Sequence, residues 1–390
     1  MNLQHGYIIS GINSNCFGCE ACAQICPQEC IELKYSFNRF WYPVIDVEKC
    51  TNCNLCKKVC PYEKIENILS SKERPVAYAA RTKNNGLLEQ STSGGIFTEL
   101  SMPILEEGGV VFGAVLTDDF KVIHQSAVNI EQLAVMRGSK YVQSRIGQTY
   151  KEAKEYLGKS RPVLFTGTPC QIAGLKTFLG KNYNNLTTVD LICHGVLAPD
   201  VAIYHIKALE KEFDTKAVKV KFRDKQQGWK KSLSFCVEFE NGQSYCRTGK
   251  EDRFYNMFLS NYDLRECCFE CPFTKTARVG DITLGDFWGI EHTKPHLFDD
   301  KGHSLVLLNS IKGEEYFSKI LPKLIYEKAQ LEQSEQQKLK RPTEPDIWRD
   351  LYLRSVLKNG LEYTVESFSR PRPLWKKGIR YFQRKFRKII

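Results

Sequence analysis

Residues 16–27 read CFGCEACAQICP, and residues 50–61 read CTNCNLCKKVCP. In both stretches the cysteines follow the spacing C-x2-C-x2-C-x3-C, and a proline comes directly after the fourth cysteine. The chain has 390 residues and 16 cysteines, and nine of the 16 lie between residues 16 and 60. Such a local concentration marks a separate cysteine-rich domain, which we place at residues 1–70.

This repeated spacing is typical of proteins that bind two [4Fe–4S] clusters. Three thiolates at three-residue steps can surround one face of a cubane from a single loop, and the fourth ligand then comes from the other stretch. The two expected ligand sets are Cys16, Cys19, Cys22 and Cys60, and Cys26, Cys50, Cys53 and Cys56. A structural zinc site is the alternative, although zinc prefers two C-x2-C pairs with a longer spacer. Cys30 lies outside both sets, and we expect it to be a buried thiol.

Residues 1–70 are therefore predicted to form a bacterial two-cluster ferredoxin-like domain, which carries single electrons but does not select a substrate. The overall composition, with 42% apolar and 26% charged residues, excludes general disorder and a fibrous chain. No apolar run approaches the roughly 18 residues of a membrane-spanning helix. The first ten residues lack the basic and apolar segments of a secretory signal, so we expect a cytoplasmic protein.

The net charge of +11 is concentrated at the C-terminal end. Residues 370–390 contain nine Lys and Arg and no acidic residue, which leaves about +2 for the rest of the chain. We therefore expect no nucleic-acid partner. Apolar side chains recur in this tail at helical steps, which predicts a basic amphipathic helix. Such a helix suits peripheral contact with the inner face of an anionic membrane, and docking on the protein's own body or on a partner is the alternative.

Residues 76–300 alternate short apolar runs with helical stretches, which predicts an α/β (α+β) core. The expected strands are residues 110–116, 162–165, 187–192, 217–222 and 281–284, with a hairpin at 232–239 and 244–247. Cys236 and Cys246 lie on that hairpin and are expected to be structural. Residues 301–369 are expected to form a helical extension before the tail.

Two polar, glycine-containing segments of the core suit a phosphate group. STSGG at residues 91–95 precedes a helical stretch, and backbone N–H groups at a helix start attract anions. In GSKYVQS at residues 138–144, Lys140 could pair with a pyrophosphate and Tyr141 could stack on a planar ring. The alternatives are an N-cap by Ser93 for the first segment and a surface loop with a core tyrosine for the second. A third segment, with Asp286 and Trp288 between two glycines, suggests a tight loop against a flat ligand or a packed aromatic turn.

Four cysteines of the core indicate a third cluster. Cys170 follows a predicted strand and begins a helix, Cys193 follows another strand, and Cys268 and Cys271 form a C-x2-C pair before a proline. Cys267 is the alternative to Cys268 as a ligand. A nucleophilic Cys170 with His194 as its base, or plain buried thiols, are the other interpretations.

Together and in this order, these segments resemble the coenzyme F-420 hydrogenase/dehydrogenase beta-subunit family, in its form with an N-terminal two-cluster ferredoxin domain. The resemblance covers roughly residues 10–300, and it is carried by STSGG (91–95), GSKYVQS (138–144), GTPCQ (167–171), CHG (193–195), CFEC (268–271) and GDITLGDFWG (280–289). It implies a flavin-binding core with FAD, a further [4Fe–4S] cluster held by Cys170, Cys193, Cys268 and Cys271, and a deazaflavin or another two-electron partner. No catalytic residue is assigned. The expected cofactor contacts are Ser91, Thr92, Ser93, Gly94, Gly95, Gly138, Ser139, Lys140, Tyr141, Gln143, Arg223, Asp286 and Trp288.

The leading hypothesis is a cytoplasmic iron–sulfur flavoprotein oxidoreductase that exchanges electrons with a redox partner protein or a ferredoxin-like donor. One alternative is a non-enzymatic electron-transfer subunit of a larger redox complex. Another is a reductase in surface-polysaccharide biosynthesis, which the basic tail favours because lipid-linked substrates lie at membranes. The sequence assigns no substrate and no direction of electron flow.

Overall fold

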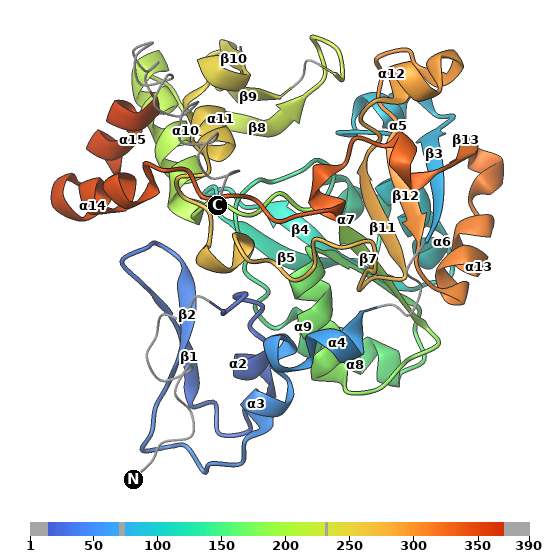
Figure 1. Cartoon of the computed structure of the whole chain (residues 1–390), viewed down its shortest axis with the longest axis horizontal. Coiled ribbons are helices and arrows are strands. Elements are labelled where there is room, and N and C mark those ends of the chain that lie inside the picture. The colour runs from blue at the N-terminus through green and yellow to red at the C-terminus, as the bar shows by residue number, and fades with distance from the viewer. Residues whose placement is uncertain (1–14, 70–74, 231–232, 370–390) are drawn as a thin grey trace, which may run out of the picture.

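The computed structural model describes residues 15–69, 75–230 and 233–369. Its centre is an eight-stranded mixed sheet with the order β13-β3-β12-β11-β7-β6-β4-β5 (Figure 1). The four central strands run parallel to one another, and the flanking strands pair in an antiparallel manner. The strands of this sheet are β3 (Val76–Thr82), β4 (Val110–Leu116), β5 (Val122–Ala127), β6 (Val163–Gly167), β7 (Leu186–Leu191), β11 (Ile282–Asp286), β12 (Ser304–Leu308) and β13 (Leu324–Ala329).

Helices cover both faces of this sheet, which explains why its central strands are almost continuously apolar. Along β4, Val110 and Phe112 pack on one side, whereas Val111 and Val115 pack on the other, as the two-residue repeat of a strand requires. The covering helices are α6 (Ile96–Glu106), α7 (Ile130–Ala134) and α13 (Ile311–Ser318) on one face, and α8 (Thr149–Gly158) and α9 (Pro169–Leu179) on the other. The predicted α/β core is thus confirmed.

The parallel arrangement decides where the functional loops meet. The carboxyl ends of β6, β7 and β11 lie at one edge of the sheet, because the three strands are parallel neighbours. The loop with Cys170, the loop with Cys193 and the loop with Trp288 follow these three strands directly. Loops at the carboxyl ends of parallel strands are the usual place for ligands in sheets of this kind.

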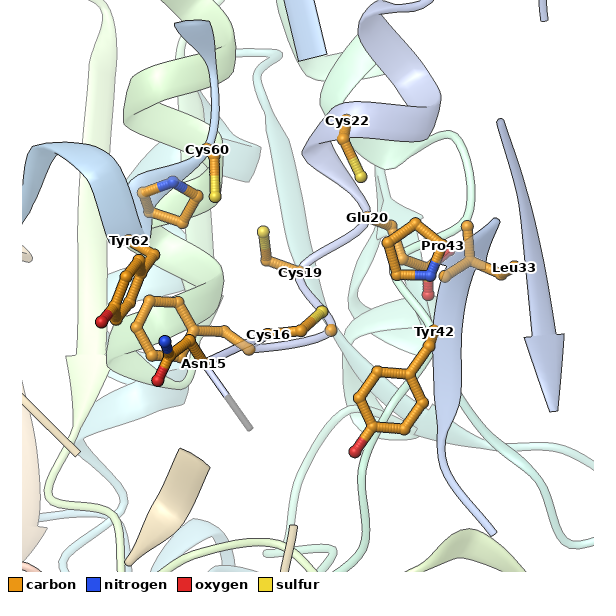
Figure 2. Close-up of a pocket in the computed structure, with 13 residues that line it drawn as sticks. Asn15, Cys16, Cys19, Glu20, Cys22, Leu33, Tyr42, Pro43, Cys60 and Tyr62 are labelled. Atoms are coloured by element: carbon orange, nitrogen blue, oxygen red, sulfur yellow. The ribbon is translucent and has the colours of Figure 1, made fainter. Parts of the chain in front are cut away.

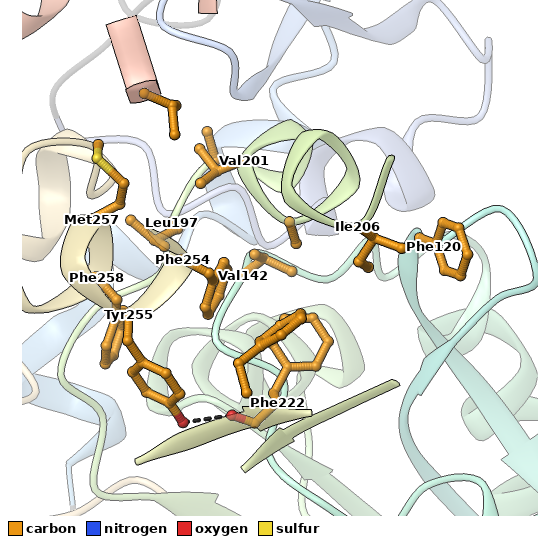
Figure 3. Packing of buried hydrophobic residues seen from close by; sticks show 14 of the residues in the cluster. Phe120, Val142, Leu197, Val201, Ile206, Phe222, Phe254, Tyr255, Met257 and Phe258 are labelled. Carbon is orange, nitrogen blue, oxygen red and sulfur yellow. Dashed lines mark hydrogen bonds between the residues drawn. The ribbon is translucent and has the colours of Figure 1, made fainter. Parts of the chain in front are cut away.

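A second layer consists of a three-stranded antiparallel sheet and the helices that pack on it. Figure 3 shows its apolar centre, in which Phe222, Phe254 and Tyr255 meet side chains of helix α10 (Pro199–Phe213). Cys236 and Cys246 lie directly opposite each other across the hairpin and form a disulfide. The elements are β8 (Ala217–Asp224), β9 (Ser234–Phe239), β10 (Ser244–Thr248), α10 (Pro199–Phe213), α11 (Arg253–Ser260), α14 (Arg349–Asn359) and α15 (Leu361–Ser369).

Residues 301–369 differ from the expected helical extension. Strands β12 and β13 of the central sheet occupy residues 304–308 and 324–329, and only α14 and α15 resemble the prediction. All five residues of β12 are buried between two sheet neighbours, so this segment belongs to the core. The physical reason is that β3 lies between β12 and β13 and pairs with both, although more than 200 residues separate it from either strand.

The cysteine-rich part is a small domain that packs against α8 and α9 (Figure 1). It contains α2 (Ala21–Ile25), α3 (Leu55–Lys58), α4 (Ile65–Ile68) and a two-stranded sheet of β1 (Ile31–Tyr35) and β2 (Trp41–Ile45). The remaining short helices are α5 (Asn85–Glu89), α12 (Ile290–Thr293) and the 3-10 turns η1 (Pro61–Lys64), η2 (Gly249–Glu251), η3 (Glu266–Cys268), η4 (Pro295–Leu297), η5 (Leu321–Lys323), η6 (Leu331–Gln333) and η7 (Gln337–Leu339).

Within the described ranges, no helix combines the length and the apolar character needed to cross a membrane. The predicted amphipathic helix at residues 370–390 lies outside the described residues, so membrane contact through it stays a prediction.

Candidate functional site

The first group of thiols lies in a cavity at the inner side of the small domain. Figure 2 shows the sulfur atoms of its four cysteines pointing toward one shared space. Three of the cysteines come from the first loop and the fourth comes from the second stretch, which is the crossed arrangement expected from the spacing. The cysteines are Cys16, Cys19, Cys22 and Cys60, and Phe17, Leu33, Tyr42, Pro43, Pro61 and Tyr62 supply apolar walls.

The second group lies in a separate cavity of the same domain and has the complementary membership. Its lining includes the four expected cysteines, Cys26, Cys50, Cys53 and Cys56. It also includes Cys30, whose Sγ lies 3.4 Å from the Sγ of Cys26. Cys30 is buried, as the sequence predicts, but its place beside the second group could not be read from the spacing.

Each of these two groups offers four thiol donors around one shared space. Within the described residues, no three His, Cys, Asp or Glu side chains lie close enough together to hold a single metal ion. The four sulfurs of each group nevertheless line one common cavity. A [4Fe–4S] cubane fits this donor set, because it takes four cysteine thiolates as ligands.

The third group forms at the carboxyl edge of the parallel strands. Burial raises the pKa of Cys193 well above its usual value, and the neighbouring Cys268, Cys170 and Cys271 raise it further. Burial and the neighbouring Cys170 and Cys268 raise the pKa of Cys271 to about 12. The four core cysteines are thus close enough to influence one another, although they come from three separate loops. Cys268 is the neighbour that the other three share, and a hydrogen bond from the Cys267 thiol lowers the pKa of Cys268.

The pair proposed for nucleophilic chemistry has other partners. His194 Nε2 lies 2.8 Å from Oδ1 of Asn261, and its ring packs against Phe258. Cys170 Sγ lies 3.2 Å from the hydroxyl of Thr168. Burial raises the pKa of Cys170 to about 11, which is opposite to the lowering expected at a helix start. This geometry does not support Cys170 as a thiolate nucleophile activated by His194.

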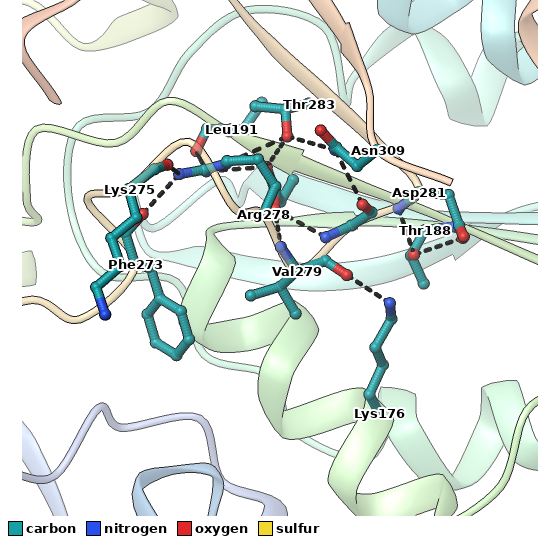
Figure 4. Close-up of polar contacts among 12 residues, drawn as sticks. Lys176, Thr188, Leu191, Phe273, Lys275, Arg278, Val279, Asp281, Thr283 and Asn309 are labelled. Atoms are coloured by element: carbon teal, nitrogen blue, oxygen red, sulfur yellow. Dashed lines mark hydrogen bonds and ion pairs between the residues drawn. The ribbon is translucent and has the colours of Figure 1, made fainter. Parts of the chain in front are cut away.

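A buried polar network fixes the loop that carries Cys271 (Figure 4). Arg278 pairs with Asp190 at 3.0 Å and also donates to the carbonyl of Phe273, two residues after Cys271. Asp190 accepts further hydrogen bonds from the backbone of Val279 and Gly280. Because Asp190 lies on β7, the network holds the loop of Cys271 to the strand that precedes Cys193.

The segment at residues 91–95 is held by internal contacts. The hydroxyls of Ser91 and Ser93 donate to backbone carbonyls, and the hydroxyl of Thr92 accepts the N–H of Ser139. A Cβ on Gly94 would lie 2.4 Å from the carbonyl oxygen of Ala80, so β3 can approach only a glycine there. The N-cap of α6 is Gly95 with a φ of 79°, and not Ser93 as the alternative interpretation has it.

Three of the expected cofactor contacts have partners within the protein. Lys140 donates to the backbone carbonyls of Ala114, Val135, Met136 and Arg137 at 2.9–3.2 Å, so its ammonium group closes the end of α7. Burial lowers its pKa to about 7. The ring of Tyr141 packs into the apolar cluster of the second layer beside Phe258. Gln143 contacts the carbonyl of Gly18 and therefore belongs to the boundary with the small domain.

Three other expected contacts do meet, together with a residue that the sequence analysis missed. Arg223 pairs with Asp286 at 2.5 Å, and its guanidinium lies 5.2 Å from the ring centroid of Trp288. Trp229 stacks on Trp288 with ring centroids 4.9 Å apart, and its indole N–H donates to Asp286. Among the described residues, the buried Nε and Nη2 of Arg223 have no hydrogen-bond partner. Trp229 follows a glycine and lies outside every segment that carries the family resemblance. Only the three-dimensional structure therefore reveals its contacts with Trp288 and Asp286.

The boundary between the small domain and the core brings the first and third groups of thiols together. Gly174 lies one helical turn after Cys170 on α9, and a Cβ there would lie 2.9 Å from the Sγ of Cys19. The carboxylate of Glu20 accepts hydrogen bonds from Arg145 and from the backbone N–H of Ile146. The first and third groups of thiols thus approach α9 at positions only one helical turn apart.

Two family models match parts of the chain. Residues 15–64 match the sequence model of the 4Fe-4S dicluster domain, and residues 160–334 match that of the C-terminal part of the coenzyme F420 hydrogenase/dehydrogenase beta subunit. No curated protein matches. Among solved structures, a chain of the xenon-derivatized F420-reducing [NiFe] hydrogenase complex from Methanosarcina barkeri is 19% identical, with 76% of this chain and 93% of that chain covered and a TM-score of 0.45. Residues 15–64 are therefore a 4Fe–4S dicluster domain that precedes, at residues 160–334, the C-terminal domain of the F420 hydrogenase/dehydrogenase beta-subunit family.

Proposed function

We propose that the chain is an iron–sulfur flavoprotein oxidoreductase that passes electrons between [4Fe–4S] clusters and FAD and exchanges two-electron equivalents with a deazaflavin or another acceptor. The observation that carries this proposal is the grouping of twelve cysteines into three sets of four, of which two adjoin at α9. Iron–sulfur clusters carry single electrons, and a flavin converts a two-electron equivalent into single electrons. A redox partner protein or a ferredoxin-like donor would supply or receive the single electrons.

In this proposal the two cavities of the small domain and the carboxyl edge of the core sheet each hold one cluster. Apolar side chains form much of the wall of the first cavity. The network of Arg278 and Asp190 fixes the loop of Cys271, and the thiol of Cys267 donates to Cys268. Cys267 is thus the hydrogen-bond donor in this assignment and Cys268 is the ligand.

The pair of Trp229 and Trp288 supports a flavin site beside the third group. Trp288 is only partly buried and stacks on the fully buried Trp229, which fixes the position of its ring. The Nε and Nη2 of Arg223, which have no hydrogen-bond partner among the described residues, suit an anionic or carbonyl oxygen. Lys225 connects this place to the segment at residues 91–95, because its ammonium donates to the carbonyl of Ser93. The phosphate contacts would then come from backbone N–H groups of that segment.

A non-enzymatic electron-transfer subunit is the second candidate. The internal contacts of Lys140 and of the hydroxyls of Ser91 and Ser93 favour it, because these groups are already used by the fold. The third candidate, a reductase of surface-polysaccharide biosynthesis, rests on residues 370–390 and gains no support from the described residues.

The iron, sulfide and flavin content of anaerobically purified protein tests the first two candidates. We expect about twelve irons and one FAD per chain. About eight irons without flavin would contradict the proposal and favour the subunit that only relays electrons. The Cys193→Ala variant should lose about four irons, whereas the matched Cys267→Ala variant should keep about twelve. Equal iron loss in both variants would overturn the assignment of the third group.

A further inference from the structure

Arg265 is a buried arginine at the boundary between the small domain and the core. Only 1% of it is exposed. Its Nε donates to the carbonyl of Cys16 at 2.8 Å, and its Nη1 donates to Oε1 of Gln143 at 2.9 Å. Its Nη2 lies 3.1 Å from the carbonyl of Trp41 and 3.4 Å from the Sγ of Cys16. The guanidinium therefore touches one thiol and otherwise only neutral groups.

The other buried arginines are paired differently. Each of them forms an ion pair with at least one carboxylate, and the pairs are Arg39 with Asp200 and Asp263, Arg223 with Asp286, Arg278 with Asp190, and Arg349 with Glu266. Within the described parts of the chain, no carboxylate forms an ion pair with Arg265. A buried charge without a counter-charge destabilises a fold by several kcal/mol, on the order of what breaking a buried pair costs.

The missing counter-charge has an obvious source in the first cavity. Four thiolates outweigh the positive charge of an iron–sulfur core, so a cluster with cysteine ligands is an anion. Cys16 is the member of that set which Arg265 reaches through both its carbonyl and its sulfur. Arg265 thus satisfies its charge only when the first group of thiols holds an anionic group.

We propose that Arg265 is the counter-charge of the cluster held by Cys16, Cys19, Cys22 and Cys60, and that it raises the reduction potential of that cluster. This inference rests on the proposed function only in taking these four thiols as cluster ligands. A reduced cluster carries one more negative charge than an oxidised one, so a fixed positive charge and an N–H donor to sulfur favour the reduced form. Arg265 acts on the cluster through Cys16 and is a positioning residue.

The second cavity offers an internal comparison. Its lining consists of cysteines and neutral residues, and Cys53 within it is exposed. The effect of Arg265 should therefore fall mainly on the first group. A smaller effect is expected on the third group, because Arg265 directly precedes the turn η3 that carries Cys268. The second group should not respond.

The test is an anaerobic redox titration of the full-length protein, followed by electron paramagnetic resonance and accompanied by iron analysis. The variants are Arg265→Met, which removes the charge, and Arg265→Lys, which keeps it. The matched control is Arg349→Met, because Arg349 pairs with Glu266 next to Arg265 but donates its other hydrogen bond to the carbonyl of Tyr262 and not to Cys16.

We expect Arg265→Met to lower the potential of one cluster, with at least a tenfold change of its oxidised-to-reduced ratio at a fixed potential, or about 59 mV for one electron. In Arg265→Lys and Arg349→Met, the potential of each cluster should change by less than this amount. Unchanged potentials in Arg265→Met with full iron content would overturn the inference alone. If Arg265→Met loses iron, the Arg265→Lys variant becomes the test. A tenfold change of the oxidised-to-reduced ratio in Arg265→Lys, which keeps the charge, would overturn the role of the charge. A wild-type protein without iron would refute the proposed function together with this inference.

Discussion

The contact between Cys19 and α9 makes a sharp prediction for the Gly174→Ala variant. A Cβ at residue 174 would lie 2.8 Å from the Cβ of Cys19, 2.9 Å from its sulfur and 2.9 Å from the hydroxyl of Tyr150. An optimal carbon–carbon contact is about 3.5–4.0 Å, so the first overlap amounts to roughly 0.7 Å. These three atoms belong to Cys19 and Tyr150, which are packed at the boundary between the two domains, so at least one of the two residues must move.

The expected magnitude follows from two opposing effects. Overpacking a tight site costs about 1–3 kcal/mol. Alanine in place of glycine inside a helix contributes about 1 kcal/mol of stability. The Gly158→Ala variant isolates the second effect, because Gly158 ends the neighbouring helix α8 and a Cβ there meets no atom within 4 Å. The free energies of unfolding of the two variants should therefore differ by about 1–3 kcal/mol, with Gly174→Ala the less stable.

Anaerobic urea unfolding followed by tryptophan fluorescence measures this difference. The second readout is the iron content together with the electron paramagnetic resonance spectrum of the first cluster, since the moved residue is one of its expected ligands. We expect Gly174→Ala to change that spectrum or to lose about four irons. Two variants of equal stability, both with the wild-type spectrum and iron content, would refute the close contact between the small domain and α9.

Three further predictions concern buried polar groups. Arg278→Met leaves Asp190 buried without its partner, so we expect a loss of about 3–5 kcal/mol in urea unfolding and iron loss from the third group. Glu20→Gln should weaken the attachment of the small domain by about 1–3 kcal/mol in the same assay, whereas exposed Glu48→Gln should change nothing. Burial lowers the pKa of His124 to about 4, so the unfolded state binds the extra proton between pH 6.5 and 4. Stability should fall by about 3 kcal/mol as the pH drops through that window, and His124→Gln should show a flatter pH profile.

The spacing of the cysteines predicted the two groups of the small domain well, because a short loop with a strict three-residue step leaves few ways to arrange its side chains. The same spacing predicted that the fourth cysteine of each stretch, Cys26 or Cys60, lies with the three cysteines of the other stretch. The third group could be predicted from two signals, the C-x2-C pair of Cys268 and Cys271 and the ends of two strands. Cys170 and Cys193 follow strands that the apolar runs reveal, and parallel pairing brings their loops to one edge.

Residue type alone could not show which polar groups the fold already uses. Lys140 and the segment at residues 91–95 have the composition of a ligand site, yet their donors meet backbone carbonyls of the fold, some nearby in sequence and others, such as that of His303 for Ser93, far away. Residues 304–308 were predicted as part of a helical extension for a related reason. Their partner strand β3 lies more than 200 residues earlier, and no local pattern records such a pairing.

Arg265 shows how the boundary between the domains acquires a functional meaning that neither domain contains alone. The residue belongs to the core, directly before η3, but most of its hydrogen bonds go to the small domain, at Cys16 and Trp41. Gly174 likewise belongs to the core, and its missing side chain is what allows Cys19 to approach within one helical turn of Cys170. Both residues act only when the small domain is attached at this position.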